Sequence, residues 1–460
     1  MKKRLVVIGA GLCGSVISAR LRNQFHVTVI EQGHRPRPLF NEVECAEGEI
    51  NTSINRGAGL GGTTNYWHNA LIELDRDDLL AAGIEPDSFE KYYSQAWSFF
   101  LDDAQRAECE KIRAANMSGI KSGTCSIAHM VVPYGRMNLW SLANSRYPGD
   151  TIEIVFGAAQ KIVPGAEGTP SHVMVQTDSS IIRIEADVLI VAGGGLSTPV
   201  ILANSILSDD TFCPGYHDHP MAYVAKLRLI PGSVLKSLSC TNTAAMDVRC
   251  GFVYEHNGIK TAFYLRPARN LDLKSISGSA RYILSDLRND PFSIKKVFQL
   301  FANLDAVKEA ILFKLKIGFR GDYYSVLLLG EQSSNSDRGL SALGAKPVLN
   351  WHVTEVEELA YRANFEQFMS DFASQITDKS LITEERWEFR TAAHHSGAAR
   401  RFVCGSDDPG LAFYRVESLE HTFVCDASLL FSGGIANSGL TLVAMSLRLA
   451  DLLSLTVTPM

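Results

Sequence analysis

The N-terminal stretch up to Glu31 constrains the fold of this chain most strongly. Leu5–Ile8 is a short, continuous apolar run, which is typical of a strand buried on both faces of a parallel sheet. It leads into Gly9–Gly14, which reads GAGLCG and opens a helix-forming run. A second apolar run, Val27–Ile30, ends in the acidic Glu31. Strand, GxGxxG turn, helix, strand and acid in this order predict a Rossmann-type unit that binds a dinucleotide.

The three glycines and the acidic residue of this unit each have a physical role. Gly9 permits the tight turn, Gly11 lets the backbone approach a pyrophosphate, and Gly14 lets helix and strand pack closely. The helix N-terminus offers unpaired amides to the anion, and Glu31 can accept hydrogen bonds from the adenosine ribose. The alternative is a glycine-rich turn that binds nothing. The unit does not distinguish NAD from FAD, but its N-terminal position, far ahead of any closing motif, favours FAD.

The composition is that of an ordinary globular chain of 460 residues, 46% hydrophobic and 20% charged. This length predicts two or three domains at about 100–200 residues each. The net charge of −6 argues against a nucleic-acid partner, because binding phosphates needs clustered Lys and Arg. Nine cysteines without a CxxC pair indicate reduced thiols in a reducing, cytoplasmic compartment. No uncharged apolar stretch of about 18 residues occurs, so we expect no membrane-spanning helix.

Two glycine-rich segments follow in the first half of the chain. Residues 57–70 read GAGLGGTTNYWHNA, which predicts a loop whose backbone closely contacts another group, although Trp67 could instead fill the core. Residues 184–205 contain the apolar run Val188–Ala192, three glycines and a helix that starts near Pro199. Ser197 or Thr198 is a candidate cap of that helix.

Two histidine clusters are candidate functional sites. His217, Asp218 and His219 suggest a metal site, but no second cluster of ligands accompanies them, and no metal is predicted. His394 and His395 are adjacent in AAHHSGAARR, so on a strand at most one of them points into a shared site. The pair alone leaves open a proton-transfer residue, a metal ligand or a packed imidazole.

Five segments in this order resemble the glucose–methanol–choline (GMC) oxidoreductases, flavoproteins that oxidise alcohols. They are GAGLCG with its acid, GLGGTTNYWHN, AGGGLSTPVILANS with the later HDHP, EQSSNSDRGLS at 331–341, and HHSG…CDASLLFSGGIANSGLTLVAMSLRLAD. Together they span almost the whole chain, and the last is the most specific. The TTNYWH loop is similar to the pyranose-oxidase and fructose-dehydrogenase side of the family.

The resemblance implies a catalytic pair. The family's HxxG pattern places the proton-accepting histidine at His394, and the turn before the last helix places its partner at Asn437. A neutral imidazole can accept a proton near pH 7, and an amide can orient the substrate hydroxyl. The chain departs from the family at Ala398, where threonine is usual, and at Ser438, where proline is usual. Either change could relax the loop that holds the pair.

The resemblance also implies FAD as the cofactor. The family's covalent histidine is replaced by Tyr66, so we predict non-covalent FAD, with His68 beside flavin N5. Asp426 and Ala427 match the segment that touches the ribityl and pyrophosphate groups, and the last helix would direct its N-terminal amides at the flavin. The predicted cofactor-binding residues are Gly9, Gly11, Gly14, Glu31, Gly62, Thr63, Asn65, Tyr66, Trp67, His68, Asp426, Ala427, Leu440 and Thr441.

The expected fold class is α/β, α+β overall: a discontinuous Rossmann-type FAD-binding domain and an antiparallel-sheet substrate domain. The FAD domain is predicted at 1–75, 150–222 and 388–460, with a cover segment at 76–149 and the substrate domain at 223–387. Expected strands of the substrate domain are Tyr223–Leu229, Thr261–Leu265 and Tyr323–Leu329. The basic, helical-period stretch 292–320 is either a domain helix with a solvated face or a membrane-surface helix that gives access to quinone.

We therefore expect an FAD-dependent oxidoreductase that oxidises a CH–OH group of a sugar, polyol or glycosylated small molecule. The sequence leaves the electron acceptor open between oxygen, quinone and other oxidants. Two alternatives are a redox-neutral flavoprotein lyase on the same fold and a non-catalytic flavin-binding protein.

Overall fold

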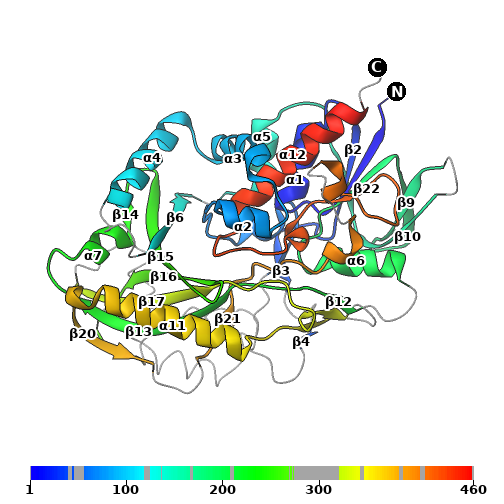
Figure 1. The fold of residues 1–460 in the computed structure, drawn as a ribbon. Helices are drawn as coiled ribbons and strands as arrows, with labels where there is room; N and C mark the ends of the chain where they lie inside the picture. The colour runs from blue at the N-terminus through cyan, green and yellow to red at the C-terminus, as the bar shows by residue number, and fades with distance from the viewer. Residues whose placement is uncertain are drawn as a thin grey trace.

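Two sheets organise the molecule, a parallel one near the two termini and an antiparallel one in the lower half of the view (Figure 1). The computed structural model describes residues 2–39, 44–45, 56–118, 125–135, 137–165, 169–207, 212–268, 270–271, 273, 321–341, 347–382, 387–404 and 410–457. The basic stretch 292–320 therefore lies outside the described residues. No helix in the described part is long and apolar enough to cross a membrane.

The parallel sheet is built from strands that are far apart in the sequence. Its order is β22–β11–β1–β2–β7, and every neighbouring pair is parallel. Leu5–Ile8 and Val188–Val191 are buried along their whole length, as expected for central strands covered on both faces. The strands are β1 (Arg4–Ile8), β2 (His26–Glu31), β7 (Glu153–Phe156), β11 (Val188–Val191) and β22 (Thr422–Val424).

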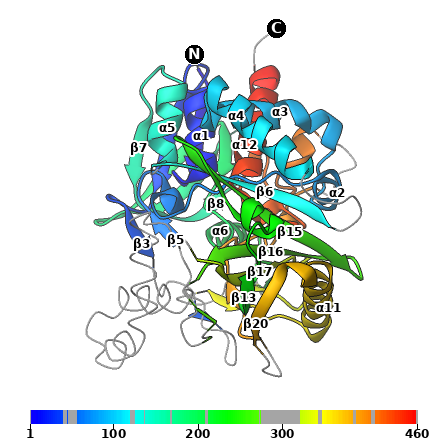
Figure 2. The same ribbon diagram turned by 90° about the vertical axis from the view of Figure 1, so that its left-hand side faces the viewer.

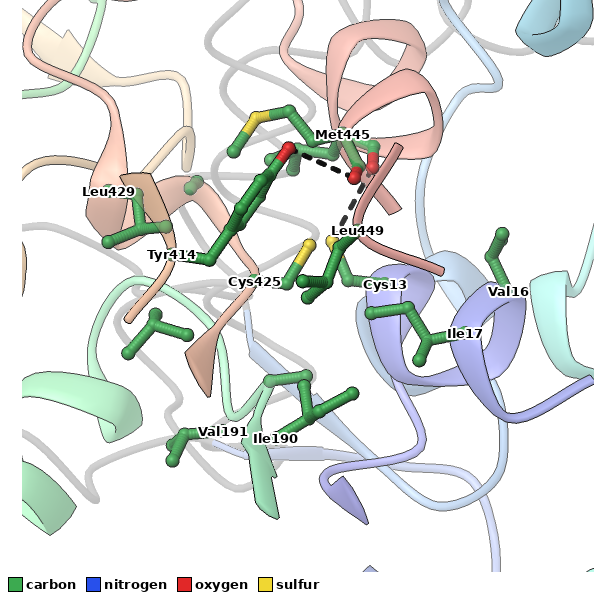
Figure 3. Close-up of a cluster of buried hydrophobic side chains, with 14 of the residues drawn as sticks. Cys13, Val16, Ile17, Ile190, Val191, Tyr414, Cys425, Leu429, Met445 and Leu449 are labelled. Carbon is green, nitrogen blue, oxygen red and sulfur yellow. Dashed lines mark hydrogen bonds between the residues drawn. The ribbon is translucent and has the colours of Figure 1, made fainter. Parts of the chain in front are cut away.

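Helices from both ends of the chain pack together beside this sheet. The close-up in Figure 3 shows Cys13 of α1 and Cys425 side by side, between Val191 of β11 and Met445 of α12. This shared core fixes the C-terminal helix against the N-terminal unit. The helices of this half are α1 (Leu12–Leu21), α2 (Arg76–Ala81), α3 (Pro86–Phe100), α4 (Asp103–Ser118), α5 (Leu139–Arg146), α6 (Ser197–Ile206) and α12 (Gly439–Val457).

The antiparallel sheet has the order β14–β15–β16–β17–β13–β20, with β6 added to β15 and β21 added to β13. One of its faces is covered by α11 (Glu355–Asp371), whose N-terminus is closed by a capping box of Thr354 and Glu357 (Figure 2). The strands are β6 (Ser126–Pro133), β13 (Pro220–Leu229), β14 (Thr241–Asn242), β15 (Met246–His256), β16 (Ile259–Pro267), β17 (Tyr323–Gly330), β20 (Ile376–Leu381) and β21 (Arg390–Thr391).

Smaller elements complete the described chain. A three-stranded antiparallel sheet contains β8, β9 and β10, a four-stranded sheet has the order β12–β18–β19–β4, and β3 pairs with β5. Their bounds are β3 (Arg37–Leu39), β4 (Glu44–Cys45), β5 (Arg56–Ala58), β8 (Ala158–Val163), β9 (Ser171–Gln176), β10 (Ile181–Ala186), β12 (Phe212–Pro214), β18 (Gly339–Ser341) and β19 (Val348–Asn350). The short helices are α7 (Val234–Ser239), η1 (Gly62–Asn65), η3 (Ala373–Gln375), η4 (Arg400–Phe402), η5 (Leu411–Phe413) and η6 (Ala427–Leu429).

The structure confirms the predicted fold class, with a parallel Rossmann-type sheet and a separate antiparallel sheet. The three expected strands lie within β13, β16 and β17. Within the predicted cover segment 76–149, β6 pairs with β15 and so belongs to the antiparallel sheet. The proposed domain boundaries stay a prediction.

Candidate active site

A cavity of about 1160 Å³ is lined by residues of both sheets. Pockets for small molecules usually have volumes of roughly 300–1,000 Å³, so this one can hold a dinucleotide together with part of a second molecule. The lining joins the GxGxxG turn at Gly9 and Gly11 to the histidine segment at His394 and to Asn437 before the last helix. The predicted cofactor and catalytic motifs therefore meet in one space.

The three glycines of the turn occupy positions that suit a dinucleotide. Gly9 has a φ of +98°, and a Cβ on Gly14 would lie 1.9 Å from the carbonyl oxygen of Gly9, so strand and helix meet too closely for a side chain. A Cβ on Gly11 would meet nothing within 4 Å, because Gly11 faces the cavity at the uncapped N-terminus of α1. The turn thus offers free backbone amides to an anion.

Glu31, at the end of β2, ties three loops around the same end of the cavity. Its buried carboxylate accepts hydrogen bonds from the backbone amides of Ala10 (2.9 Å), Gly33 (3.0 Å) and Gly59 (2.8 Å). The glycine loop lies directly on the turn, since a Cβ on Gly62 would be 2.8 Å from the Cα of Gly11. Glu31 still lines the cavity, where the one remaining of its roughly four lone-pair sites can accept a hydrogen bond from a hydroxyl group.

Asp426 fixes the far side of the dinucleotide region. Its buried carboxylate accepts hydrogen bonds from the amide of Gly194 (2.8 Å), the hydroxyl of Thr198 (2.6 Å) and both the amide and the hydroxyl of Ser428. Burial raises the pKa of Asp426, an effect opposed by these hydrogen bonds. The expectation that Ser197 or Thr198 caps α6 is wrong, because the cap is Leu196, which makes no side-chain bond.

The HDHP and HHSG segments lie side by side as an antiparallel pair. The amides of His217 and Ser396 each donate to the other's carbonyl oxygen, at 3.1 and 3.0 Å. Two residues along, the amide of Ala392 donates to the carbonyl of His219 at 3.1 Å. The register shifts by two residues between these contacts, since Pro220 of β13 pairs with Thr391 of β21, and the rings of His219 and His394 meet at this irregularity.

The two rings form a directional hydrogen-bond chain. Nε2 of His219 lies 2.9 Å from the carbonyl oxygen of Gly434, and Nδ1 of His219 lies 2.8 Å from Nδ1 of His394. A carbonyl only accepts, so Nε2 of His219 carries the proton, and Nδ1 of this neutral ring is an acceptor. His394 must therefore donate from its Nδ1, which leaves the lone pair of His394 on Nε2. The tautomer follows from the partners of His219 rather than from His394 itself.

Burial keeps both rings neutral. Desolvation lowers the pKa of His394 well below the ordinary value of 6.5, and the neighbouring His219 and His395 lower it further. Desolvation also lowers the pKa of His219, an effect opposed by Asp218. One extra proton can be accommodated at the Nδ1···Nδ1 contact, whereas a proton on both rings would place two donors against each other.

Asp218 holds the backbone on which this pair rests. Its carboxylate accepts hydrogen bonds from the amides of His219 and His394 and from the hydroxyl of Thr391. Its own amide donates to Gln332 in the EQSSNSDRGLS segment at 3.3 Å. Asp218, His219 and His394 have the atom types and spacing of a metal site. These hydrogen bonds already use the atoms that a metal would need.

The side chain of His395 contacts different residues from that of His394. Its Nδ1 lies 2.7 Å from the hydroxyl of Tyr216, and its backbone packs on Gly195. Both histidines line the same cavity, at different places, although we expected at most one to reach a shared site. Burial lowers the pKa of His395 to about 3, so it too is a neutral imidazole.

The turn after the histidines is held by its backbone. The amides of Gly397 and Ala399 donate to the carbonyls of Ala427 and Ser428, at 3.2 and 3.1 Å. Ala398, which replaces the family's usual threonine, is fully buried between them. Within the described part of the chain the side chain of Asn437 makes no hydrogen bond, and Asn437 lines the cavity.

Most of the predicted site residues line the cavity, and four do not. Thr441 is buried with its hydroxyl 2.8 Å from that of Tyr93, and Asn65 is bound to neighbouring backbone inside the glycine loop. The predicted residues that line the cavity are Gly9, Gly11, Glu31, Gly62, Thr63, Tyr66, Trp67, His68, His394, Asp426, Ala427 and Asn437. Those absent from the lining are Gly14, Asn65, Leu440 and Thr441.

Three residues of the site were not predicted to act there from the sequence. His219 and Asp218 were considered only as metal ligands, although HDHP belongs to the segments that carry the family resemblance. Arg56 also lines the dinucleotide end of the cavity, where its guanidinium donates to the hydroxyl of Ser197.

Comparisons with known proteins agree with this architecture. Residues 7–43 match the model of an NAD(P)-binding Rossmann-like domain. A comparison with curated proteins finds no match. Pyridoxine 4-oxidase from Mesorbium loti is similar over 98% of this chain and 99% of its own, with a TM-score of 0.59 and 12% identity. The chain shares the fold of that oxidase. At this identity the likeness concerns the fold, and the function has to be argued from the site.

Proposed function

We propose that the chain is an FAD-dependent oxidoreductase that oxidises a CH–OH group of a sugar, polyol or glycosylated small molecule. One observation carries the proposal: His394, locked in one tautomer by His219, shares a cavity with Asn437 and with a dinucleotide-binding turn. A lone pair and an unengaged amide beside a dinucleotide are what alcohol oxidation requires. Oxygen, a quinone or another oxidant would then accept the electrons.

The residues present fit FAD. Gly11 leaves open space at the helix N-terminus for a pyrophosphate, and Glu31 can still accept a hydrogen bond from a ribose hydroxyl. Asp426, Ala427 and the start of α12 at Gly439 line the other side of the same space. FAD, when bound, supplies the acceptor for the hydride that leaves the substrate carbon. Tyr66, in place of a histidine, supports non-covalent binding.

The chain's own residues would handle the proton. Nε2 of His394 accepts the hydroxyl proton of the substrate, because Nδ1 of His394 is engaged as a donor to His219. The positive charge formed on His394 is then shared with His219, whose Nε2 proton is held by Gly434. Asn437 can orient the hydroxyl and stabilise negative charge on its oxygen as the proton leaves. His219 is thus a positioning residue rather than a group that touches the substrate.

Anaerobic bleaching of the yellow holoprotein tests the proposal. The protein is mixed without oxygen with a broad panel of sugars, polyols and other alcohols, and absorbance near the flavin maximum is followed. We expect bleaching by members of one substrate class. Lack of bleaching across the panel would count against oxidation and favour a redox-neutral or non-catalytic flavoprotein. Acid precipitation of the same protein should release the flavin into the supernatant, and flavin retained in the pellet would contradict non-covalent binding.

A further inference from the structure

One face of the antiparallel sheet forms a wall of the cavity, and the strand alternation decides which residues lie on it. Along β16, Phe263 and Leu265 pack in the core with α11, whereas Tyr264 and Arg266 line the cavity. The ring of Tyr264 covers Gly251 of the neighbouring strand, where a Cβ would come within 2.5 Å of it. Much of the remaining wall is apolar: Met130, Val132, Met221, Leu327 and Leu329.

Three arginines reach this part of the cavity, and two of them have carboxylate partners. Arg249 lies 3.1 Å from Asp247, and Arg390 lies 2.8 Å from Glu388. The side chain of Arg266 makes neither a hydrogen bond nor an ion pair with any residue that the structure describes. Arg266 is half-buried, and its guanidinium is therefore a positive charge on a mostly apolar wall, without a protein counter-ion in the described chain.

A guanidinium in such a place is suited to an anionic group of the substrate. Its planar fork donates two parallel hydrogen bonds to a carboxylate or phosphate, and apolar surroundings strengthen that attraction relative to water. We propose that the cavity selects alcohols that carry an oxyanion, a carboxylate or a phosphate, and that Arg266 binds it. This inference rests on the proposed oxidation of alcohols and names the substrate class.

The sheet register also places the oxyanion away from the reacting carbon. Arg266 stands opposite Ser325 of β17, which stands opposite Lys226 of β13. His219 immediately precedes β13, so the chain between His219 and Lys226 covers about 23 Å at roughly 3.3 Å per residue. The long arginine side chain spans part of this distance, and the substrate spans the rest. The selected alcohol is therefore elongated, with its hydroxyl and its charge at opposite ends, unlike a 2-hydroxy acid.

A series of matched compounds of increasing chain length tests the inference on the holoprotein. Terminal hydroxy acids of increasing chain length are compared with the uncharged diols of the same length, and the concentration that half-saturates anaerobic bleaching is measured. At one range of lengths we expect the hydroxy acid to half-saturate at a concentration about 10- to 100-fold lower than the diol. Monophosphate esters of the same diols distinguish phosphate from carboxylate as the preferred group.

Variants assign the effect to Arg266. Arg266→Gln should remove most of the advantage of the charged compounds. Arg228→Gln, on the same sheet but exposed and stacked on Tyr323 at 5.5 Å, should keep it. Equal half-saturation by acids and diols at every length, or an advantage that persists in Arg266→Gln, would overturn the inference.

Calorimetry separates this inference from the proposed function. If no compound bleaches the flavin, the oxidation is in doubt, but titration of the holoprotein with inorganic phosphate and with acetate still reports the anion site. Binding that is present in the wild type and lost in Arg266→Gln supports the site. Absence of binding of both anions, or equal binding in both proteins, overturns it.

Discussion

Replacing His219 should impair proton transfer without touching the substrate. In His219→Leu the acceptor for Nδ1 of His394 disappears, while a side chain of similar bulk remains. His394 is then free to carry its proton on Nε2, the nitrogen that has to accept the substrate proton. His219→Asn is the matched variant, because its amide oxygen can stand near the former Nδ1 and accept the same hydrogen bond.

The expected loss follows from the 2.8 Å hydrogen bond between the two rings. Leaving a buried donor without its acceptor costs about 1–3 kcal/mol, and each 1.4 kcal/mol is a factor of ten. The limiting rate of anaerobic bleaching should therefore fall about 5- to 150-fold in His219→Leu and much less in His219→Asn. The half-saturating substrate concentration should change little, because His219 does not contact the substrate.

Rapid-mixing absorbance at saturating substrate measures this rate, and flavin content and melting temperature confirm folding. His172→Leu, in β9 of the three-stranded sheet, serves as the control, because His172 does not line the cavity. Equal rates in His219→Leu and His219→Asn would refute the tautomer argument, because only one of them removes the acceptor.

Two further predictions concern the cofactor turn and pH. Gly14→Ala should lower the melting temperature, because its Cβ would lie 1.9 Å from the Gly9 carbonyl oxygen. Gly11→Ala should fold normally but bind flavin more weakly, because its Cβ would enter the cavity. Equal melting temperatures and equal flavin affinities of the two variants would contradict this. Burial lowers the pKa of both His217 and His395 to about 3, whereas unfolded histidine titrates at about 6.5. The unfolded chain therefore binds more protons below pH 6.5, and each ring should cost about 1.4 kcal/mol of stability per pH unit as the pH falls. Urea unfolding between pH 7 and 5 measures this, and a flat profile would refute it.

The local features of the fold could be predicted from the sequence. The GxGxxG turn, the buried strands and α12 depend on short-range patterns of glycine and apolar residues, and the structure has them at the expected positions. The sequence did not assign β6 to the antiparallel sheet, because an apolar run of this length does not identify the strand it pairs with. Strand pairing over long separations is decided by tertiary packing rather than by local pattern.

The candidate site, too, could be predicted where it depends on local sequence but not where it depends on contacts between distant segments. The assignment of His394 and Asn437 as a catalytic pair followed from the family resemblance, and both residues line the cavity. His219 did not follow, because its contact with His394 joins residues 175 positions apart and depends on the register of two irregular segments. Leu440 and Thr441 are turned inward by the helical phase of α12, which presents Gly439 and Leu442 to the cavity instead.

The most direct test of the account is the anaerobic bleaching rate of His394→Ala with the best substrate of the panel, beside wild type. General-base catalysis by a positioned imidazole contributes about 10²- to 10⁴-fold. We predict a loss in this range, with flavin still bound and the melting temperature within a few degrees of wild type. Bleaching by His394→Ala at close to the wild-type rate would contradict the assignment of His394 as the proton acceptor.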